Sequence, residues 1–204
     1  MKLSILILTI EKRKHKLSEL LGKLDVQIGG GGSIIVDKHI SMYSIRYGDN
    51  ERIIEIVVNY DEIANIGEKR NALLKIANGE YVCFFDDDDE PSPNYIQTLL
   101  DAIETKPDCA SLRGIMTTNG TNPEIFEHSL KYKAWRTTNN KIKYERYPNH
   151  LNCIKSQIAK QFKFPEINHG EDFQWSKAIH ESGILKTEYY IDDILYYYKF
   201  VTNK

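Results

Sequence analysis

Residues 79–89 of this 204-residue chain read Gly-Glu-Tyr-Val-Cys-Phe-Phe-Asp-Asp-Asp-Asp, and this stretch decides the fold. The apolar run Tyr81 to Phe85 is typical of a parallel strand that is covered on both faces of a sheet. The pair Asn78-Gly79 predicts a left-handed stop for a preceding helix that starts near Gly67. Four aspartates follow the strand at its carboxyl end, which is where open α/β sheets bind ligands.

Strands and helices alternate on both sides of this stretch. The run Leu3 to Ile10 predicts a strand, and the leucines that follow it at helical spacing predict a helix. Two β-branched runs, Ile34 to Val36 and Ile53 to Val58, predict further strands. Ser92-Pro93 is expected to cap and open another helix. This order favours one α/β domain over residues 1–204, with a mostly parallel central sheet and flanking helices.

The remainder of the chain is less regular. Residues 112–116 favour a strand, whereas residues 119–140 are polar and typical of a loop. Helices are expected at residues 154–162 and 173–179, and strands at 187–191 and 196–198.

Composition excludes several classes of protein. The formal net charge is −2 and no long basic block is present, so nucleic acid is not expected as a partner. Three widely spaced cysteines predict neither a disulfide framework nor a zinc site. The apolar run near the N-terminus is shorter than the roughly 20 residues of a membrane span, and no signal cleavage site follows it. We therefore expect a protein of the cytoplasm. The sequence from Gly29 to Ser33 predicts a flexible loop, although a synthetic linker has the same composition.

The four aspartates, residues 86–89, give the strongest chemical signal. Like charges about 4 Å apart repel by about 4 kcal/mol per pair at an effective dielectric near 20, so we expect a bound cation. Hard carboxylate oxygens suit Mg²⁺ or Mn²⁺, which complete their coordination with water and substrate phosphate. The alternative is a solvated acidic turn before the next helix.

Two further segments contain candidate residues. Residues 66–71, Ile-Gly-Glu-Lys-Arg-Asn, place a glycine and two cations in the first turn of a helix, where the macrodipole favours an anion. A solvated basic turn balanced by Glu68 is the alternative. Residues 170–172, Gly-Glu-Asp, open another helix, although acids are ordinary in a first turn. His150 is a weaker candidate, because a lone histidine is more often structural.

In this order and spacing, Thr9 and residues 66–71, 79–89 and 170–172 resemble a GT-A glycosyltransferase of the family 2 type. Residues 149–152 and 170–175 resemble its short phage, viral and bacterial members. The resemblance implies a GT-A fold with a nucleotide-binding half, 1–100, and an acceptor-binding half, 101–204. It also implies a metal-dependent enzyme that uses Mn²⁺ or Mg²⁺ and moves a sugar with inversion from a nucleotide-sugar donor, expected to be a UDP-sugar.

The same resemblance implies roles for individual residues. Asp172 matches the general base, Asp88 the metal ligand with Asp89 close behind, and Asp86 the residue that faces the ribose. The nucleotide-binding residues implied in this way are Thr9, Glu11, Asp61 (with Asp37 as the alternative), Gly67, Lys69, Arg70, Asp86 and Asp87. His150, Glu171 and Trp175 are expected near the acceptor or behind the catalytic residues.

The sequence departs from the family pattern in one motif, and two other classes of protein are alternatives. Gln174-Trp175 lacks the arginine of the Q-x-x-R-W motif of processive members, which favours transfer of a single sugar. A sugar nucleotidyltransferase would need a glycine-rich phosphate loop after the first strand, where residues 9–14 contain no glycine. A Ca²⁺-dependent sugar-binding module would use the aspartates as a cage and leave Lys69 and Arg70 without a role. The sugar and the acceptor, whether saccharide, lipid-linked molecule or protein, stay open.

Overall fold

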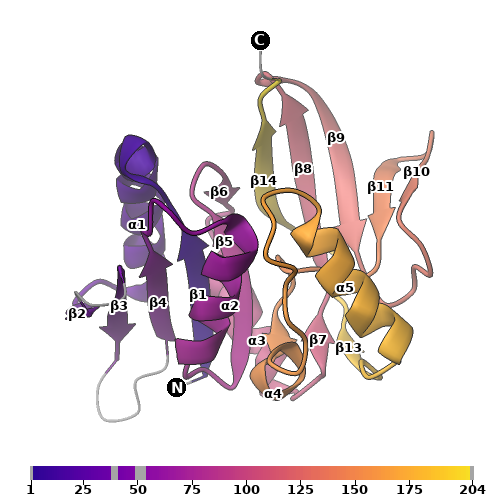
Figure 1. Ribbon diagram of the computed structural model, residues 1–204. Helices are drawn as coiled ribbons and strands as arrows, with labels where there is room; N and C mark the ends of the chain where they lie inside the picture. Colours follow the sequence, from indigo (N-terminus) through magenta and orange to yellow (C-terminus); the bar gives the residue numbers. More distant parts are fainter. Residues whose placement is uncertain (1, 38–40, 49–53, 203–204) are drawn as a thin grey trace.

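The computed structural model describes residues 2–37, 41–48 and 54–202, whose strands form two neighbouring sheets (Figure 1). The eight-stranded sheet has the order β13 (Glu188–Tyr189), β7 (Cys109–Ala110), β12 (Ile154–Lys155), β5 (Tyr81–Asp86), β1 (Leu3–Leu8), β4 (Ile54–Asn59), β3 (Met42–Tyr47), β2 (Ser33–Asp37). The six-stranded sheet has the order β10 (Arg136–Thr137), β11 (Ile142–Arg146), β9 (Thr121–His128), β8 (Leu112–Thr118), β14 (Ile194–Phe200), β6 (Glu90–Pro91).

The larger sheet is parallel at its centre and mixed toward its edges. Strand β1 pairs in parallel with β4 and with β5. On one side, β2 and β3 form an antiparallel hairpin against β4, and on the other side β12 runs antiparallel to β5. The α/β class is therefore confirmed, but the sheet is mixed, because an unexpected hairpin strand and short strands from beyond residue 100 complete it.

Helices cover both faces of the larger sheet, and the alternation along β1 decides which helix packs where. Leu3, Ile5 and Ile7 pack in one cluster with α1 and α3, whereas Leu6 packs in a second cluster with α2, α4 and α5. This follows from the period of two along a strand. The helices are α1 (Lys14–Ile28), α2 (Ile66–Ile76), α3 (Tyr95–Glu104), α4 (Ser156–Ala159) and α5 (Glu171–Ser182).

The expected stop at Asn78-Gly79 is wrong in its geometry. Helix α2 ends at Ile76, and Ala77 already has extended backbone angles, φ −57° and ψ 133°. Gly79 is needed for another reason, because a Cβ there would lie 2.5 Å from the backbone nitrogen of Ser4. The glycine thus lets the start of β5 approach β1.

Other local predictions differ from the structure near residues 92 and 119–162. Asn94 rather than Ser92 stands at the N-cap of α3, and the Ser92 hydroxyl donates to the Asn94 side chain (2.8 Å). The segment expected to be a loop contains β9 and β10, and the helix expected at 154–162 is the short α4 preceded by β12. No helix within the described residues is long and apolar enough to cross a membrane.

Candidate active site

The carboxyl ends of three adjacent strands bring predicted nucleotide-binding residues together. Leu8 at the end of β1 pairs with Asn59 of β4 and with Asp86 of β5, so the residues that follow these three lie at one edge. The backbone N–H of Thr9 donates to the carbonyl of Asn59 (2.9 Å), and Lys69 Nζ donates to the carbonyl of Thr9 (2.9 Å). Thr9 and Lys69 are therefore held at the edge of the sheet where the resemblance places the nucleotide.

Asp61 and Glu11 flank this edge. Asp61 follows β4, and hydrogen bonds from the backbone N–H groups of Ala64 and Ile63 lower the pKa of its carboxyl. Glu11 follows β1 and forms an exposed ion pair with Lys14. The alternative to Asp61, Asp37, ends β2 in the same row, two strands out from Asn59, and its side chain lies outside the described structure.

Cations of the chain itself neutralise Asp87 and Asp88. Arg13 Nη1 donates to Asp87 Oδ1 (2.9 Å) and lies 3.4 Å from Asp88 Oδ2, which is also 3.7 Å from Lys16 Nζ. Burial raises the pKa of the Asp87 carboxyl, while Thr9 and Arg13 oppose the rise. Arg13 and Lys16 therefore offset part of the charge repulsion among these aspartates, and a bound cation at this position stays a prediction.

Asp89 faces away from this edge. The hydroxyl of Tyr196 donates to one of its oxygens and the backbone N–H of Lys199 to the other, each at 2.8 Å. Burial and the charge of Asp86 raise the pKa of its carboxyl. These hydrogen bonds link the turn after β5 to β14. The four aspartates therefore do not form the cage of oxygen ligands that a Ca²⁺ module requires.

The donor set near Asp88 fits a divalent ion that is shared with substrate phosphate. Among the described residues, no three His, Cys, Asp or Glu side chains are grouped so that they could hold a metal by themselves. The side chain of Asp88 is 26% exposed and leaves carboxylate surface open to a ligand. Mg²⁺ and Mn²⁺ accept one or two carboxylates with phosphate and water oxygens, so the residues present suit such an ion.

Arg70 lies at the centre of the site. Its guanidinium lies over the rings of Phe84 (5.0 Å) and Phe164 (5.7 Å). Nε donates to Glu171 Oε1 (3.2 Å) and Nη2 to Asp86 Oδ1 (3.5 Å), whereas Nη1 is buried without a hydrogen-bond partner in the described part of the chain. Buried donors are nearly always bonded, so Nη1 is an unused hydrogen-bond donor at the centre of the site.

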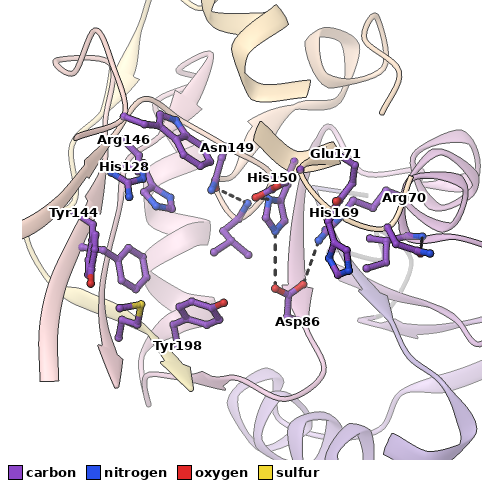
Figure 2. Close-up of a pocket in the computed structure, with 18 residues that line it drawn as sticks. Arg70, Asp86, His128, Tyr144, Arg146, Asn149, His150, His169, Glu171 and Tyr198 are labelled. Atoms are coloured by element: carbon purple, nitrogen blue, oxygen red, sulfur yellow. Dashed lines mark hydrogen bonds and ion pairs between the residues drawn. The ribbon is translucent and has the colours of Figure 1, made fainter. Parts of the chain in front are cut away.

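His150 lies between the carboxylates of Asp86 and Asp172, and Figure 2 shows its contact with Asp86. Its Nε2 is 4.0 Å from Asp86 Oδ2 and its Nδ1 is 3.7 Å from Asp172 Oδ2. Burial alone would raise the pKa of the Asp86 carboxyl, but His150 and Arg70 outweigh burial and hold this pKa well below its usual range. The weakest of the sequence candidates is thus placed next to the predicted general base.

The start of α2 is closed to an anion, contrary to expectation. All four N–H groups of its first turn are occupied by Asn65 or by the loop of residues 165–168. The bonds run from Ile66 to Asn168 Oδ1 (3.1 Å), Gly67 to Ile167 O (3.1 Å), Glu68 to Asn65 Oδ1 (2.9 Å) and Lys69 to Asn65 O (3.1 Å). A Cβ on Gly67 would lie 1.8 Å from the carbonyl oxygen of Pro165, so this glycine, predicted to contact the nucleotide, packs against the loop.

Trp175 was expected near the acceptor or behind the catalytic residues, and it lies in the core behind Arg70, because it packs on Phe164. Its ring stacks on Phe164 with centroids 4.6 Å apart, and its Nε1 donates to the carbonyl of Phe162 (3.1 Å). The helical period turns this position of α5 toward the sheet, whereas Glu171 and Asp172 at the start of the helix face the cavity.

A cavity of about 420 Å³ extends from these residues to the smaller sheet. One wall contains Arg70, Asp86, His150, Glu171 and Asp172. The opposite wall was not predicted from the sequence. Four of its residues come from β9 and β11, strands that were not predicted: Phe126, His128, Tyr144 and Arg146. The wall also contains Met116 and Tyr198, which lie in predicted strands, and Trp135, which lies outside the strands. Its size is within the ordinary range for small-molecule sites.

Comparisons with known proteins identify the family. The sequence matches the family model described as glycosyl transferase family 2 over residues 49–164, which is more than half of the chain. No curated protein sequence matches. Among solved structures, the chain resembles S. aureus TarS 1–349 in complex with UDP-GlcNAc (18% identity, TM-score 0.65, covering 100% of this chain and 60% of that chain). It also resembles the same protein in complex with UDP (18%, 0.64, 98% and 60%).

The chain therefore spans about 60% of the length of these TarS structures. At this identity the likeness concerns the fold, and it confirms the expected GT-A architecture. From the match over residues 49–164, the chain belongs to glycosyl transferase family 2, a family of enzymes.

Proposed function

We propose that this chain transfers a single sugar from a nucleotide-sugar donor to an acceptor hydroxyl, with inversion at the anomeric carbon. The observation that carries the proposal is the arrangement of Asp172 and Asp86 around one cavity, next to the strand edge that holds Thr9 and Lys69. A UDP-sugar is the proposed donor, because the TarS structures of the same fold hold UDP and UDP-GlcNAc.

The donor is proposed to lie along the carboxyl ends of β1, β4 and β5. Thr9, Glu11 and Asp61 would contact the nucleoside, and Asp86 the ribose. Asp88 would hold Mn²⁺ or Mg²⁺, and the bound ion supplies positive charge to the diphosphate as the glycosidic bond breaks. Arg13 holds Asp87 and Asp88 in position for this contact.

Asp172 is proposed to accept the proton of the acceptor hydroxyl while that hydroxyl attacks the anomeric carbon. The new glycosidic bond forms on the face opposite the nucleoside diphosphate, which leaves with the electron pair of the broken bond. The Asp172 side chain is 29% exposed and faces the cavity, whereas Glu171 is buried and bonded to Arg70. This difference favours Asp172 over its neighbour as the base, and His150 restricts its orientation from 3.7 Å away.

The test is release of UDP from UDP-sugars, with water as the acceptor, in the presence of Mn²⁺. Asp172→Asn should lower turnover by about 10² to 10⁴, the usual contribution of a general base, and leave the Kd of UDP within about twofold. Glu181→Gln is the matched control, because it removes an exposed carboxylate (63%) from the same helix. Unchanged turnover in Asp172→Asn, or an equal loss of turnover and UDP affinity, would contradict the assignment.

A further inference from the structure

The strands β9 and β11 turn a row of side chains into the cavity. Phe126 pairs with Tyr144 and His128 with Arg146, so these four side chains share one face of the smaller sheet. Figure 2 shows His128, Tyr144 and Arg146 across the cavity from Asp86 and Glu171. With Trp135, these residues form what we term the β11 wall. The mechanism proposed above uses none of them.

Arg146 on this wall is held in place but is not neutralised. Its guanidinium lies over the rings of Trp135 (5.1 Å) and Tyr144 (5.5 Å). Its Nη1 donates to the backbone carbonyls of Arg136 and Glu145. The contacts fix the guanidinium by stacking and by neutral oxygens, and they leave its charge uncompensated.

Other arginines of the described residues show the contrast. Each of them except the exposed Arg136 lies within ion-pair distance of a carboxylate: Arg13, Arg46, Arg70 and Arg113. For Arg146 no such carboxylate is found in the described part of the chain. Burial lowers the pKa of the Arg146 guanidinium, because its charge has lost water without gaining a counter-ion. An anionic ligand would offset that cost.

Two more polar atoms of the β11 wall are buried and unbonded. Trp135 Nε1 and His128 Nδ1 have no hydrogen-bond partner among the described residues. The indole N–H can only donate, and the His128 residue is 5% exposed. Since buried polar atoms are nearly always bonded, two of them beside an unpaired arginine indicate that the oxygens of a ligand belong here.

We propose that the β11 wall binds a phosphate or carboxylate of the sugar acceptor, through Arg146, Trp135 and His128. This inference rests on the proposed function. The acceptor is favoured over the donor because the donor diphosphate is assigned to Asp88 on the larger sheet, whereas this wall belongs to the smaller one. The acceptor hydroxyl must lie at Asp172, so a molecule that carries both a hydroxyl and an anionic group would contact both walls.

The experiment is titration calorimetry with glycerol 1-phosphate as the probe, in protein saturated with UDP and Mg²⁺. Wild-type protein should bind this probe and not glycerol. Arg146→Gln should weaken binding at least tenfold, which equals about 1.4 kcal/mol, and leave the Kd of UDP unchanged. Trp135→Phe, which keeps an aromatic ring and removes the N–H donor, should weaken probe binding at least threefold. The control Arg136→Gln removes an exposed arginine from the neighbouring strand and should change nothing.

Three results would overturn the inference. The first is that wild-type protein binds UDP but not glycerol 1-phosphate. The second is that neither variant lowers the affinity for glycerol 1-phosphate. The third is that Arg146→Gln weakens the binding of UDP-glucuronate but not of UDP-glucose, which would show that Arg146 binds an anionic group of the donor sugar. Failure of wild-type protein to bind UDP would instead contradict the proposed function. If Arg146→Gln does not fold by circular dichroism, Trp135→Phe decides the matter.

Discussion

Gly67→Ala tests whether this glycine packs against a loop or contacts the nucleotide. The added Cβ would lie 1.8 Å from Pro165 O, and ordinary contact begins near 3.4 Å, so the loop must retreat by about 1.6 Å. Such a shift would break the bond from Gly67 N to Ile167 O. Overpacking costs about 1–3 kcal/mol and a hydrogen bond about 1 kcal/mol, so we expect a loss of about 3 kcal/mol. For a chain of this length, Tm should fall by about 6–12 °C.

Thermal unfolding and UDP titration on the same protein separate the two roles of Gly67. We expect the low Tm together with a UDP Kd within about threefold of wild type, and reduced turnover because the displaced loop leads to Asp172. Gly22→Ala is the control: it lies in α1 with nothing within 4 Å of the added Cβ, so helix propensity should raise stability by about 1 kcal/mol. An unchanged Tm with a tenfold loss of UDP affinity would refute the packing argument.

Asp88→Asn should abolish the Mn²⁺-dependent part of UDP binding in calorimetry without lowering Tm, and an unchanged Mn²⁺ dependence would remove Asp88 from the metal site. Arg70→Ala should destabilise the protein by about 3–5 kcal/mol in urea unfolding, because buried Glu171 loses its cation, whereas Arg136→Ala should stay within about 0.5 kcal/mol. Burial, then the charges of His150 and Arg146, lower the pKa of His128 to about 3. The unfolded chain takes up this proton near pH 6.5, so stability present above that pH is lost as pH falls toward 3. By pH 5 the loss is about 2 kcal/mol, and in His128→Asn it should disappear from urea unfolding curves compared at pH 7.5 and 5.

The central strands and the site edge could be predicted because their signals are local. Residues 81–85 are continuously apolar and all are buried. The acids follow directly, and the parallel register of β1, β4 and β5 then places three strand ends together. Strand β9 gives no such signal. Its first three residues are exposed, it contains Pro123, and part of it lines a cavity, so its sequence lacks the apolar alternation of a half-buried strand.

The start of α2 shows a different limit. Asn65 and Glu68 form a capping box, a pattern visible in the sequence that would have indicated occupied N–H groups. The closure by residues 165–168, in contrast, depends on packing between segments about 100 residues apart. Arg13 is similar, because its partner Asp87 lies 74 positions away and no local pattern links them.

Residues 165–172, a loop that leads into the start of α5, link the proposed base to the proposed donor site. Pro165 packs on Gly67 at the start of α2, and Glu171, the first residue of α5, bonds to Arg70, one turn further along α2. Arg70 also bonds to Asp86, which lies beside the proposed donor. Asp172 follows Glu171 directly, so its position depends on the same arginine that holds Asp86. A change in this chain of contacts should therefore misplace the base before it removes the nucleoside contacts at β1 and β4, and turnover should fall further than UDP affinity.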